Sequence, residues 1–344
     1  MQERIYSFGT AKVQYIFDGS LRYLKNLCHP KSTVIITDEH VYTAHASQFK
    51  GWNSIVLKPG EAYKNQATVD SVIAQLVEQG VDRSYTLVGI GGGVITDLTG
   101  YVASIYMRGI RFGFVPTTVL ALVDASIGGK NGVDVGVYKN MVGIIRQPAF
   151  LLHDLSLLKS LPEAEWINGF AEIIKHACIK DASLFKELSE KNIAFYQKNK
   201  KALAYLIERN ALIKTKVVQK DEYEKGDRKL LNYGHTLGHA IENMYELSHG
   251  QAIAIGMTYA AGLSESLIGF KQQSQIVQIL SQYGLPTNAT FDLKKAINIL
   301  IKDKKKKGSE IHYILLQKIG KGVIHSIPLN KIEPLLEKVI KQYS

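Results

Sequence analysis

Two groups of residues in this chain could do chemistry: glycine-rich turns that could hold phosphate, and histidines spaced to bind a metal. The first glycine-rich stretch, Gly91 to Asp97, follows a strand-like segment over 85–90 and precedes a helix that we expect to begin near Leu98. Glycine lets the backbone approach a phosphate closely, and the first turn of a helix offers free N–H groups. The stretch is neither the Gly-x-Gly-x-x-Gly fingerprint nor a P-loop. A nucleotide-phosphate site and a plain tight turn are therefore both open interpretations.

Further residues suited to anions follow the neighbouring strand-like segments. Thr117 and Thr118 come after one such segment, and Lys130 ends a second glycine-rich loop over 124–130. Hydroxyl, backbone N–H and ammonium groups all bind phosphate or carboxylate oxygens. Arg108 could hold a phosphate with two parallel hydrogen bonds. Asp38 ends another strand at the edge of the sheet where such folds bind ligands, and its carboxylate could bond a ribose hydroxyl.

The histidines of the second half indicate a metal site. His235 and His239 are four residues apart and face the same side of a helix, so spacing alone predicts that both bind zinc. His249, at a helix start, is a third candidate. Glu172 lies on an otherwise apolar helix face, where a buried carboxylate needs a partner such as a metal. The alternative for any one of these histidines is a purely structural role.

The secondary structure that must position these residues is predicted to change near residue 154, from alternating strands and helices to helices alone. Before it, strand-like runs over 32–38, 53–57, 85–90 and 113–116 alternate with helical spacing over 68–79, which predicts an α/β domain with a parallel sheet. After it, amphipathic helical stretches cover 163–180, 182–220, 235–247, 250–268 and 272–283. We therefore expect two domains, residues 1–153 and 154–344.

Composition limits the class of protein. The chain has 344 residues, a formal net charge of +11 and two cysteines, Cys28 and Cys178, which favours a reducing cytoplasm over a disulfide framework. No apolar run is long enough for a membrane helix, and the N-terminus has no signal-peptide pattern. The positive charge fits a nucleic acid or a small anionic substrate, and we find no nucleic-acid-binding signature. The basic run 302–307 is interpreted as a solvated loop.

Taken in order, these residues resemble the 3-dehydroquinate synthase family, one of the sugar phosphate cyclases. The similarity runs from about Ile36 to Lys305. The motifs that carry it in the first half are Pro59–Lys64, Gly91–Asp97, Arg108–Gly109, Pro116–Thr118, Asp124–Lys130, Lys139–Asn140 and Leu158–Pro162. Those in the second half are Ala171–Lys175, Leu231–His235, His249–Gly250 and Asp303–Lys305. The resemblance implies an α/β N-terminal Rossmann-like domain that binds NAD, an all-α C-terminal domain that binds metal and substrate, and a homodimer.

The resemblance also assigns roles to particular residues. It implies that one divalent metal, zinc or cobalt, is held by Glu172, His235 and His249, and it moves His239 from the metal to the substrate. A three-ligand site keeps positions open for substrate oxygens. The residues implied for NAD are Asp38, Pro59, Gly60, Glu61, Ala62, Tyr63, Lys64, Gly93, Val94, Ile95, Thr96, Asp97, Thr117, Thr118, Lys130, Lys139, Leu157, Leu158, Lys159 and Ser160. Those implied for the substrate are Arg108, Asp124, Asn140, Lys175, Lys214, Arg228, Asn232, His239 and a lysine of the pair Lys304/Lys305.

The activity that the resemblance implies is a lyase reaction. 3-Deoxy-D-arabino-heptulosonate 7-phosphate would be converted to 3-dehydroquinate and phosphate, in the shikimate pathway to aromatic amino acids. The implied steps are transient oxidation by NAD, β-elimination of phosphate, return of the hydride, ring opening and an aldol closure. The net redox change is zero. A substrate with both a carboxylate and a phosphate fits the many implied lysine and arginine contacts.

The chain departs from the family pattern at several points. Asn131 follows the Gly-Gly-Lys loop where threonine or a small apolar residue is expected, and Gln251 stands where glutamate is common. The segment from His235 to His249 is a few residues short. Three alternatives follow: another sugar phosphate cyclase, a metal-dependent polyol dehydrogenase that releases NADH, and a basic nucleic-acid-binding protein. Lasting NADH would indicate the second of these, and strongly salt-dependent binding to nucleic acid the third.

Overall fold

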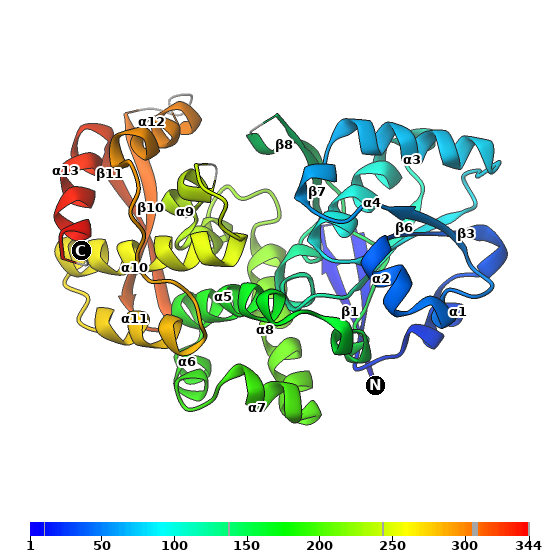
Figure 1. Cartoon of the computed structure of the whole chain (residues 1–344), viewed down its shortest axis with the longest axis horizontal. Coiled ribbons are helices and arrows are strands. Elements are labelled where there is room, and N and C mark those ends of the chain that lie inside the picture. The colour runs from blue at the N-terminus through cyan, green and yellow to red at the C-terminus, as the bar shows by residue number, and fades with distance from the viewer. Residues whose placement is uncertain (10, 137, 243, 305–308, 343–344) are drawn as a thin grey trace. The chain divides into compact units, whose positions relative to one another are not determined.

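The structure is a computed structural model that describes residues 1–342 except Thr10, Val137, Asn243 and 305–308 (Figure 1). The chain divides into two compact units. The first comprises Met1–Trp166 and Lys201–Tyr223, and the second comprises Ile167–Lys200 and Glu224–Ser344. Helix α8 (Lys200–Lys220) therefore belongs almost entirely with the first unit, although it lies in the helical half of the sequence.

Within the described residues, the first unit is built on a seven-stranded sheet of order β1–β2–β9–β6–β5–β3–β4. Its strands run parallel, except that β1 and β2 form an antiparallel hairpin. The central strands are buried along almost their whole length, as expected where both faces of a parallel sheet are covered. The strands are β1 (Gln2–Phe8), β2 (Ala11–Phe17), β3 (Thr33–Asp38), β4 (Asn53–Leu57), β5 (Thr86–Gly91), β6 (Arg111–Pro116) and β9 (Phe150–Leu152).

The strand order reverses between β3 and β5. From β3 the chain moves to one side to form β4, and it then adds β5 and β6 on the other side. Parallel α/β sheets bind ligands outside the carboxyl ends of the strands at such a point. Asp38 ends β3 and Gly91 ends β5, so both lie at this edge. The predicted Rossmann-like arrangement is confirmed.

Helix α4 (Gly93–Ile105) follows β5 after the single residue Gly92. Our expectation that it begins near Leu98 is wrong, because the Thr96 N–H already donates to the Gly92 carbonyl oxygen at 3.1 Å. Glycines have low helix propensity, so the pattern placed the start too late. The helix packs closely: a methyl group at Gly100 would overlap the Asn131 amide. The other helices of this region are α1 (Leu24–Leu27), α2 (Glu39–Ala44) and α3 (Gln66–Glu78).

A second sheet of two strands, β7 (Lys130–Val135) and β8 (Tyr138–Ile145), was not predicted. Its large exposed apolar side chains are Val135, Tyr138, Met141, Val142 and Ile144. Apolar residues on an exposed two-stranded hairpin do not give the alternation of a half-buried strand, so the sequence pattern did not predict these two strands.

The second unit is mainly helical, as predicted. Its helices are most of α5 (Glu163–Lys180), then α6 (Ala182–Ser189), α7 (Ile193–Lys198), α9 (His235–Glu242), α10 (His249–Ile268), α11 (Gln273–Gln282), α12 (Leu293–Lys304) and α13 (Leu329–Ile340). An antiparallel hairpin of β10 (Glu310–Lys318) and β11 (Lys321–Pro328) adds to them and was missed by the sequence analysis (Figure 1). Strand β10 packs on α10, where Ser264 Oγ accepts a hydrogen bond from the Leu316 N–H at 2.9 Å.

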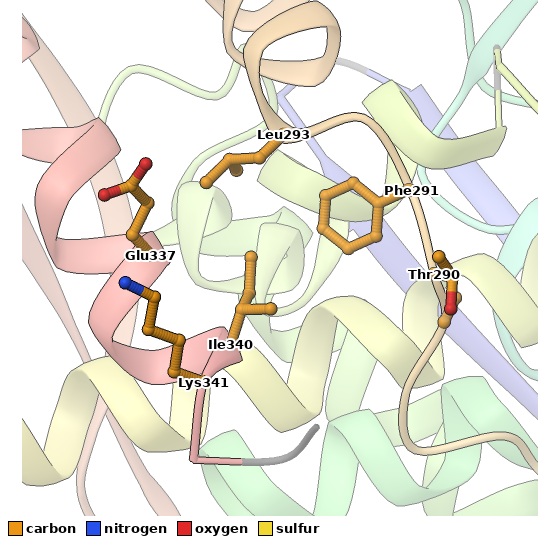
Figure 2. A pocket seen from close by; sticks show the side chains of 7 residues that line it. Thr290, Phe291, Leu293, Glu337, Ile340 and Lys341 are labelled. Carbon is orange, nitrogen blue, oxygen red and sulfur yellow. The ribbon is translucent and has the colours of Figure 1, made fainter.

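A cavity of about 290 Å³ lies near the end of α13 (Figure 2). It is lined by Ala289, Thr290, Phe291, Leu293, Glu337, Ile340 and Lys341. The residues predicted for the cofactor, metal and substrate are absent from this lining. Among the described residues, no helix combines the length and the apolar character needed to cross a membrane.

His153 is a buried histidine in the core of the first unit. The side chain is 1% exposed, and neither ring nitrogen has a hydrogen-bond partner among the described residues. Burial lowers the pKa of His153 to about 3. Between pH 6.5 and 3, the unfolded chain therefore binds a proton on this imidazole that the folded chain does not bind. The contribution of the neutral imidazole to the free energy of unfolding is therefore fully present above pH 6.5 and is lost as the pH falls towards 3.

We predict that His153→Phe weakens this pH dependence. Each pH unit within the window should cost the wild type about 1.4 kcal/mol through His153. Urea unfolding at pH 6.5 and pH 5 should show a drop that is about 2 kcal/mol smaller in the variant. His40→Phe, at an exposed position, serves as the control. Equal drops in His153→Phe and the wild type would contradict the prediction.

Candidate functional site

The glycine turn after β5 presents the start of α4 to solvent or ligand. Gly92 is the N-cap residue and has an extended backbone, and no side chain caps the helix. A Cβ on Gly92 would lie 3.1 Å from the Thr118 side chain, and one on Gly93 would lie 3.2 Å from Ala125. The Thr117 N–H donates to the Gly91 carbonyl oxygen at 2.9 Å, which joins two predicted motifs. The first-turn N–H groups of α4 are thus arranged as in helix-terminal phosphate sites.

The β7–β8 hairpin is fastened to the loop after β4. The Lys64 ammonium is buried, lies 2.5 Å from Asp97 and donates to Asn140 Oδ1 at 2.7 Å. Lys139 lies 2.9 Å from Glu61. Burial alone would lower the pKa of Lys64, but the carboxylates around it, above all Asp97, raise the pKa. Burial raises the pKa of Asp97, and Lys64 opposes that rise. Residues from three distant motifs therefore form one polar cluster.

A second ion pair joins α8 to a short π-helical turn, Ala121–Ala125. Lys214 Nζ lies 2.9 Å from Asp124 Oδ1 and also donates to the Asp124 carbonyl oxygen at 2.8 Å. π-Helical turns are rare and occur often at functional sites. The pair fixes a lysine ammonium that the resemblance implies for substrate binding.

Most of the other residues predicted for the first unit belong neither to the cluster around Lys64 nor to the pair of Lys214 and Asp124. Asp38 Oδ1 accepts a hydrogen bond from the Val41 N–H at 3.0 Å and caps α2. Ser160 Oγ lies 2.9 Å from His45 Nε2. Arg108 is exposed and has a φ of 65°. Of the remainder, Leu157 and Leu158 are buried, whereas Gly60, Glu61, Ala62, Tyr63, Lys130 and Lys159 are exposed.

The second unit brings Glu172, His235 and His249 together. One ligand atom from each lies within 4.8 Å of the others. Glu172 Oε1 is 3.5 Å from His235 Nε2 and 3.4 Å from His249 Nε2. Glu172 is fully buried on α5 and also pairs with Lys175, one turn further along the helix. Two imidazole nitrogens and one carboxylate oxygen suit zinc or cobalt, and such a three-ligand set leaves positions for substrate.

The backbone of α9 and α10 sets this arrangement. A Cβ on Gly238 would lie 2.9 Å from the Ala252 carbonyl oxygen, and one on Gly234 would lie 2.7 Å from that of Ile253. The two helices can approach this closely because both positions are glycine. The rings of His235 and His249, which begin the two helices, then lie 5.4 Å apart between centroids.

The two histidines have different electrostatic surroundings. Burial lowers the pKa of His235 well below its ordinary value, and the Lys175 ammonium lowers it further. Burial also acts to lower the pKa of His249, but hydrogen bonds with Glu172 and Glu242 outweigh it and raise the pKa to about 9. Without a metal, burial thus favours the neutral imidazole at His235, whereas the two carboxylates favour the protonated form at His249.

Of the remaining predicted residues of this unit, His239 lies next to His235, and Arg228 and Asn232 lie on the 3-10 helix Asp227–Asn232. His239 is exposed, and its ring centroid lies 5.1 Å from that of His235. Arg228 is buried, and Asn232 donates to Glu224 Oε1 at 2.5 Å. The predicted lysine at 304 or 305 cannot be placed, because Lys305 and the side chain of Lys304 lie outside the described residues.

Sequence reasoning missed three polar residues at this site. Asn168 Oδ1 accepts from the Gly250 N–H at 2.5 Å and ties the start of α10 to α5. Glu224 pairs with Asn232, and Glu242 Oε2 lies 3.4 Å from His249 Nδ1. Only Glu242 had a signal in the sequence, because it is three residues after His239 on the same helical face.

Two of the departures from the family pattern, Asn131 and Gln251, have structural explanations. The Asn131 amide donates to the carbonyl oxygens of Gly129 at 2.8 Å and Arg146 at 2.9 Å, and so closes the glycine loop. Gln251 completes a capping box at the start of α10, where its Oε1 accepts from the Ser248 N–H at 2.9 Å. A glutamine can serve in such a box as well as a glutamate.

Comparisons with known proteins cover nearly the whole chain. The family profile described as 3-dehydroquinate synthase N-terminal matches residues 54–168, and the profile described as 3-dehydroquinate synthase C-terminal matches residues 169–306. A 3-dehydroquinate synthase of Alkaliphilus metalliredigens is 39% identical over 333 residues, which are 93% of either chain.

Two solved structures are similar to this chain along its length. A 2-deoxy-scyllo-inosose synthase complexed with carbaglucose-6-phosphate, NAD⁺ and Co²⁺ has a TM-score of 0.82 at 25% identity, covering 99% of either chain. The 2-epi-5-epi-valiolone synthase of Streptomyces hygroscopicus subsp. jinggangensis 5008, with NAD⁺ and Zn²⁺ bound, has a TM-score of 0.87 at 24% identity. That match covers 98% of this chain and 99% of the other, and at this identity it indicates the fold alone.

Proposed function

Because the chain belongs to the 3-dehydroquinate synthase family, we propose that it converts 3-deoxy-D-arabino-heptulosonate 7-phosphate to 3-dehydroquinate and phosphate. The observation that carries this proposal is the convergence of Glu172, His235 and His249 beside the buried Lys175. A metal-binding group next to a fixed ammonium suits a hydroxylated, anionic substrate. The higher identity to a 3-dehydroquinate synthase than to the other cyclase favours this substrate over other sugar phosphates.

The proposed cofactors are NAD and one divalent metal, Zn²⁺ or Co²⁺. When bound, NAD would reversibly accept a hydride from a substrate carbinol, and the metal would lower the pKa of the substrate hydroxyls. We place NAD at the start of α4 and at the pair of Lys64 and Asp97. We place the metal on Glu172, His235 and His249.

The chain's own residues would mainly bind and orient the substrate. The ammonium of Lys175 is held by Glu172, and that of Lys214 is held by Asp124, so both cations have fixed positions. Arg108, Arg228, Asn140 and Asn232 would add hydrogen bonds to phosphate and carboxylate oxygens. His239 would exchange protons with substrate oxygens from its exposed position. These residues would act by orienting the substrate and stabilising charge, and none of them would form a covalent intermediate with it.

The test is phosphate release from 3-deoxy-D-arabino-heptulosonate 7-phosphate with NAD⁺ and Zn²⁺, while absorbance reports NADH. We expect phosphate to be released without lasting NADH, because the hydride returns to the substrate. Accumulation of NADH would indicate a polyol dehydrogenase instead. No phosphate from this substrate, but release from another sugar phosphate, would indicate a different cyclase.

We further propose that the protein is a cytoplasmic homodimer. Both of its cysteines are free, which suits a reducing compartment. The exposed apolar side chains of the β7–β8 hairpin support a second copy as the partner, since large exposed apolar patches mark interaction surfaces. Ile144→Lys should shift sedimentation equilibrium towards monomer. The control Ile324→Lys changes a similarly exposed isoleucine on β11 and should leave the dimer intact. An unchanged dimer in Ile144→Lys would contradict the hairpin interface.

A further inference from the structure

We propose that Glu242 is a positioning residue that orients His249 for metal binding, an inference that rests on the proposed metal site. Glu242 is the last residue of α9, and its side chain is 12% exposed. Its Oε2 lies 3.4 Å from His249 Nδ1, on the opposite side of the ring from the Nε2 that faces Glu172. The carboxylate therefore touches the ligand but is not one of the three predicted donors.

Both histidines have an acceptor next to Nδ1. For His235 it is the Tyr233 carbonyl oxygen at 3.1 Å, and for His249 it is the Glu242 carboxylate. An imidazole that donates from Nδ1 keeps its lone pair on Nε2, so both acceptors favour the tautomer whose Nε2 can bind the metal proposed to lie beside Glu172. The acceptor also fixes the ring rotation. His249 needs this support more, because its side chain is 28% exposed against 11% for His235.

The two acceptors differ in charge, and that difference gives Glu242 a second effect. The charge of Glu172 is offset by the ammonium of Lys175 beside it. Glu242 adds a negative charge next to Nδ1 of His249. This charge makes Nε2 of the imidazole a stronger electron-pair donor to a metal, and it also attracts a divalent cation. The neutral Tyr233 carbonyl next to Nδ1 of His235 can orient that ring but adds no charge.

A direct role in metal binding is the competing explanation. Ligand atoms of His239, Glu242 and His249 also lie within 4.8 Å of one another. The two arrangements use His249 differently, since its Nε2 faces Glu172 and His235 while its Nδ1 faces Glu242. The buried group with Glu172 is better enclosed, because His239 is exposed. The geometry thus favours Glu242 as the partner of a ligand.

The test measures Co²⁺ binding to the full chain without substrate, by calorimetry and by the visible spectrum of the bound ion. The variant is Glu242→Gln, which keeps the shape and a hydrogen-bonding group but removes the charge. The matched control is Glu246→Gln, an exposed glutamate on the segment that joins α9 to α10, which loses the same charge. Thermal unfolding of each metal-free protein separates a folding defect from a binding defect.

We expect Glu242→Gln to raise the Kd for Co²⁺ by roughly 10- to 100-fold, with the shape of the visible spectrum and the metal-free unfolding temperature unchanged. Glu246→Gln should change the Kd little. An unchanged Kd in Glu242→Gln, or a loss equal to that in Glu246→Gln, would overturn the inference. A new spectrum would also overturn it, because Glu242 would then be a ligand. Failure of the wild type to bind Co²⁺ at all would instead contradict the proposed metal site and, with it, this inference.

Discussion

Replacing Glu172 with glutamine is expected to abolish metal binding and to lower kcat/KM by at least about 10³-fold, because a Lewis-acid metal contributes several kcal/mol to such a reaction. Glu172 supplies the carboxylate oxygen that both histidine Nε2 atoms face, at 3.4 and 3.5 Å. Glutamine has nearly the same volume but carries no charge. Metal affinity from calorimetry and phosphate release with saturating Zn²⁺ would measure the two effects.

The Glu172 variant has a confounding effect on folding. It leaves the Lys175 ammonium, which is 1% exposed, without its carboxylate partner, and breaking a buried pair costs about 3–5 kcal/mol. His249→Ala avoids this problem, because it keeps the Glu172–Lys175 pair while removing one predicted ligand. It should also lose metal binding and activity, with a smaller change in stability. Glu163→Gln, at an exposed position of the same helix, is the control for charge. Full activity and metal affinity in both test variants would contradict the proposed metal site.

Among substitutions in the first unit, we expect Lys64→Met to cause the largest loss of stability and of NAD affinity. The ammonium lies 2.5 Å from Asp97 and is 5% exposed, so its removal leaves a half-buried carboxylate without this cation. The expected loss in the free energy of unfolding is about 3–5 kcal/mol. The polar cluster that holds Asn140 and the β7–β8 hairpin also loses its central cation, so NAD affinity should fall at least about 10-fold. Urea unfolding and calorimetric NAD titration would measure the two losses.

The double variant Lys64→Met/Asp97→Asn separates these losses. Removing both charges should restore much of the stability, because no carboxylate is left unpaired. NAD affinity should stay low, since the groups proposed to bind it are still missing. Lys50→Met changes an exposed lysine outside this loop and should alter neither quantity. If the double variant regained wild-type NAD affinity, Lys64 would have only a structural role.

The local pattern of the sequence was sufficient for the central elements of the fold. Strands β3, β4, β5 and β6 and helices α3, α5, α10 and α11 lie close to their predicted positions, because each combines a long apolar pattern with clear turn signals. Both two-stranded sheets, β7–β8 and β10–β11, were missed. The burial of β10 depends on α10, which is distant in sequence, and β8 is exposed along most of its length, so neither strand has a diagnostic period of its own.

The polar contacts of the candidate site could not be predicted in the same way. The sequence identified Lys64, Asp97 and Asn140 as members of separate motifs, but nothing in their spacing indicates that one ammonium joins all three. Spacing also paired His235 with His239 for the metal. In the structure Glu172 faces His235 and His249, which start two helices brought together by Gly234 and Gly238.

The amino-acid sequence by itself therefore determined the α/β and helical halves, the glycine turn, the family, and the types of side chain available for a metal and an anionic substrate. Those properties follow from short-range periodicity and residue chemistry. Only the tertiary structure decided which donors face one another, which cations are held by carboxylates, and that Glu242 lies behind His249. Such pairings depend on how closely two backbones approach, and a single glycine or a distant strand sets that distance.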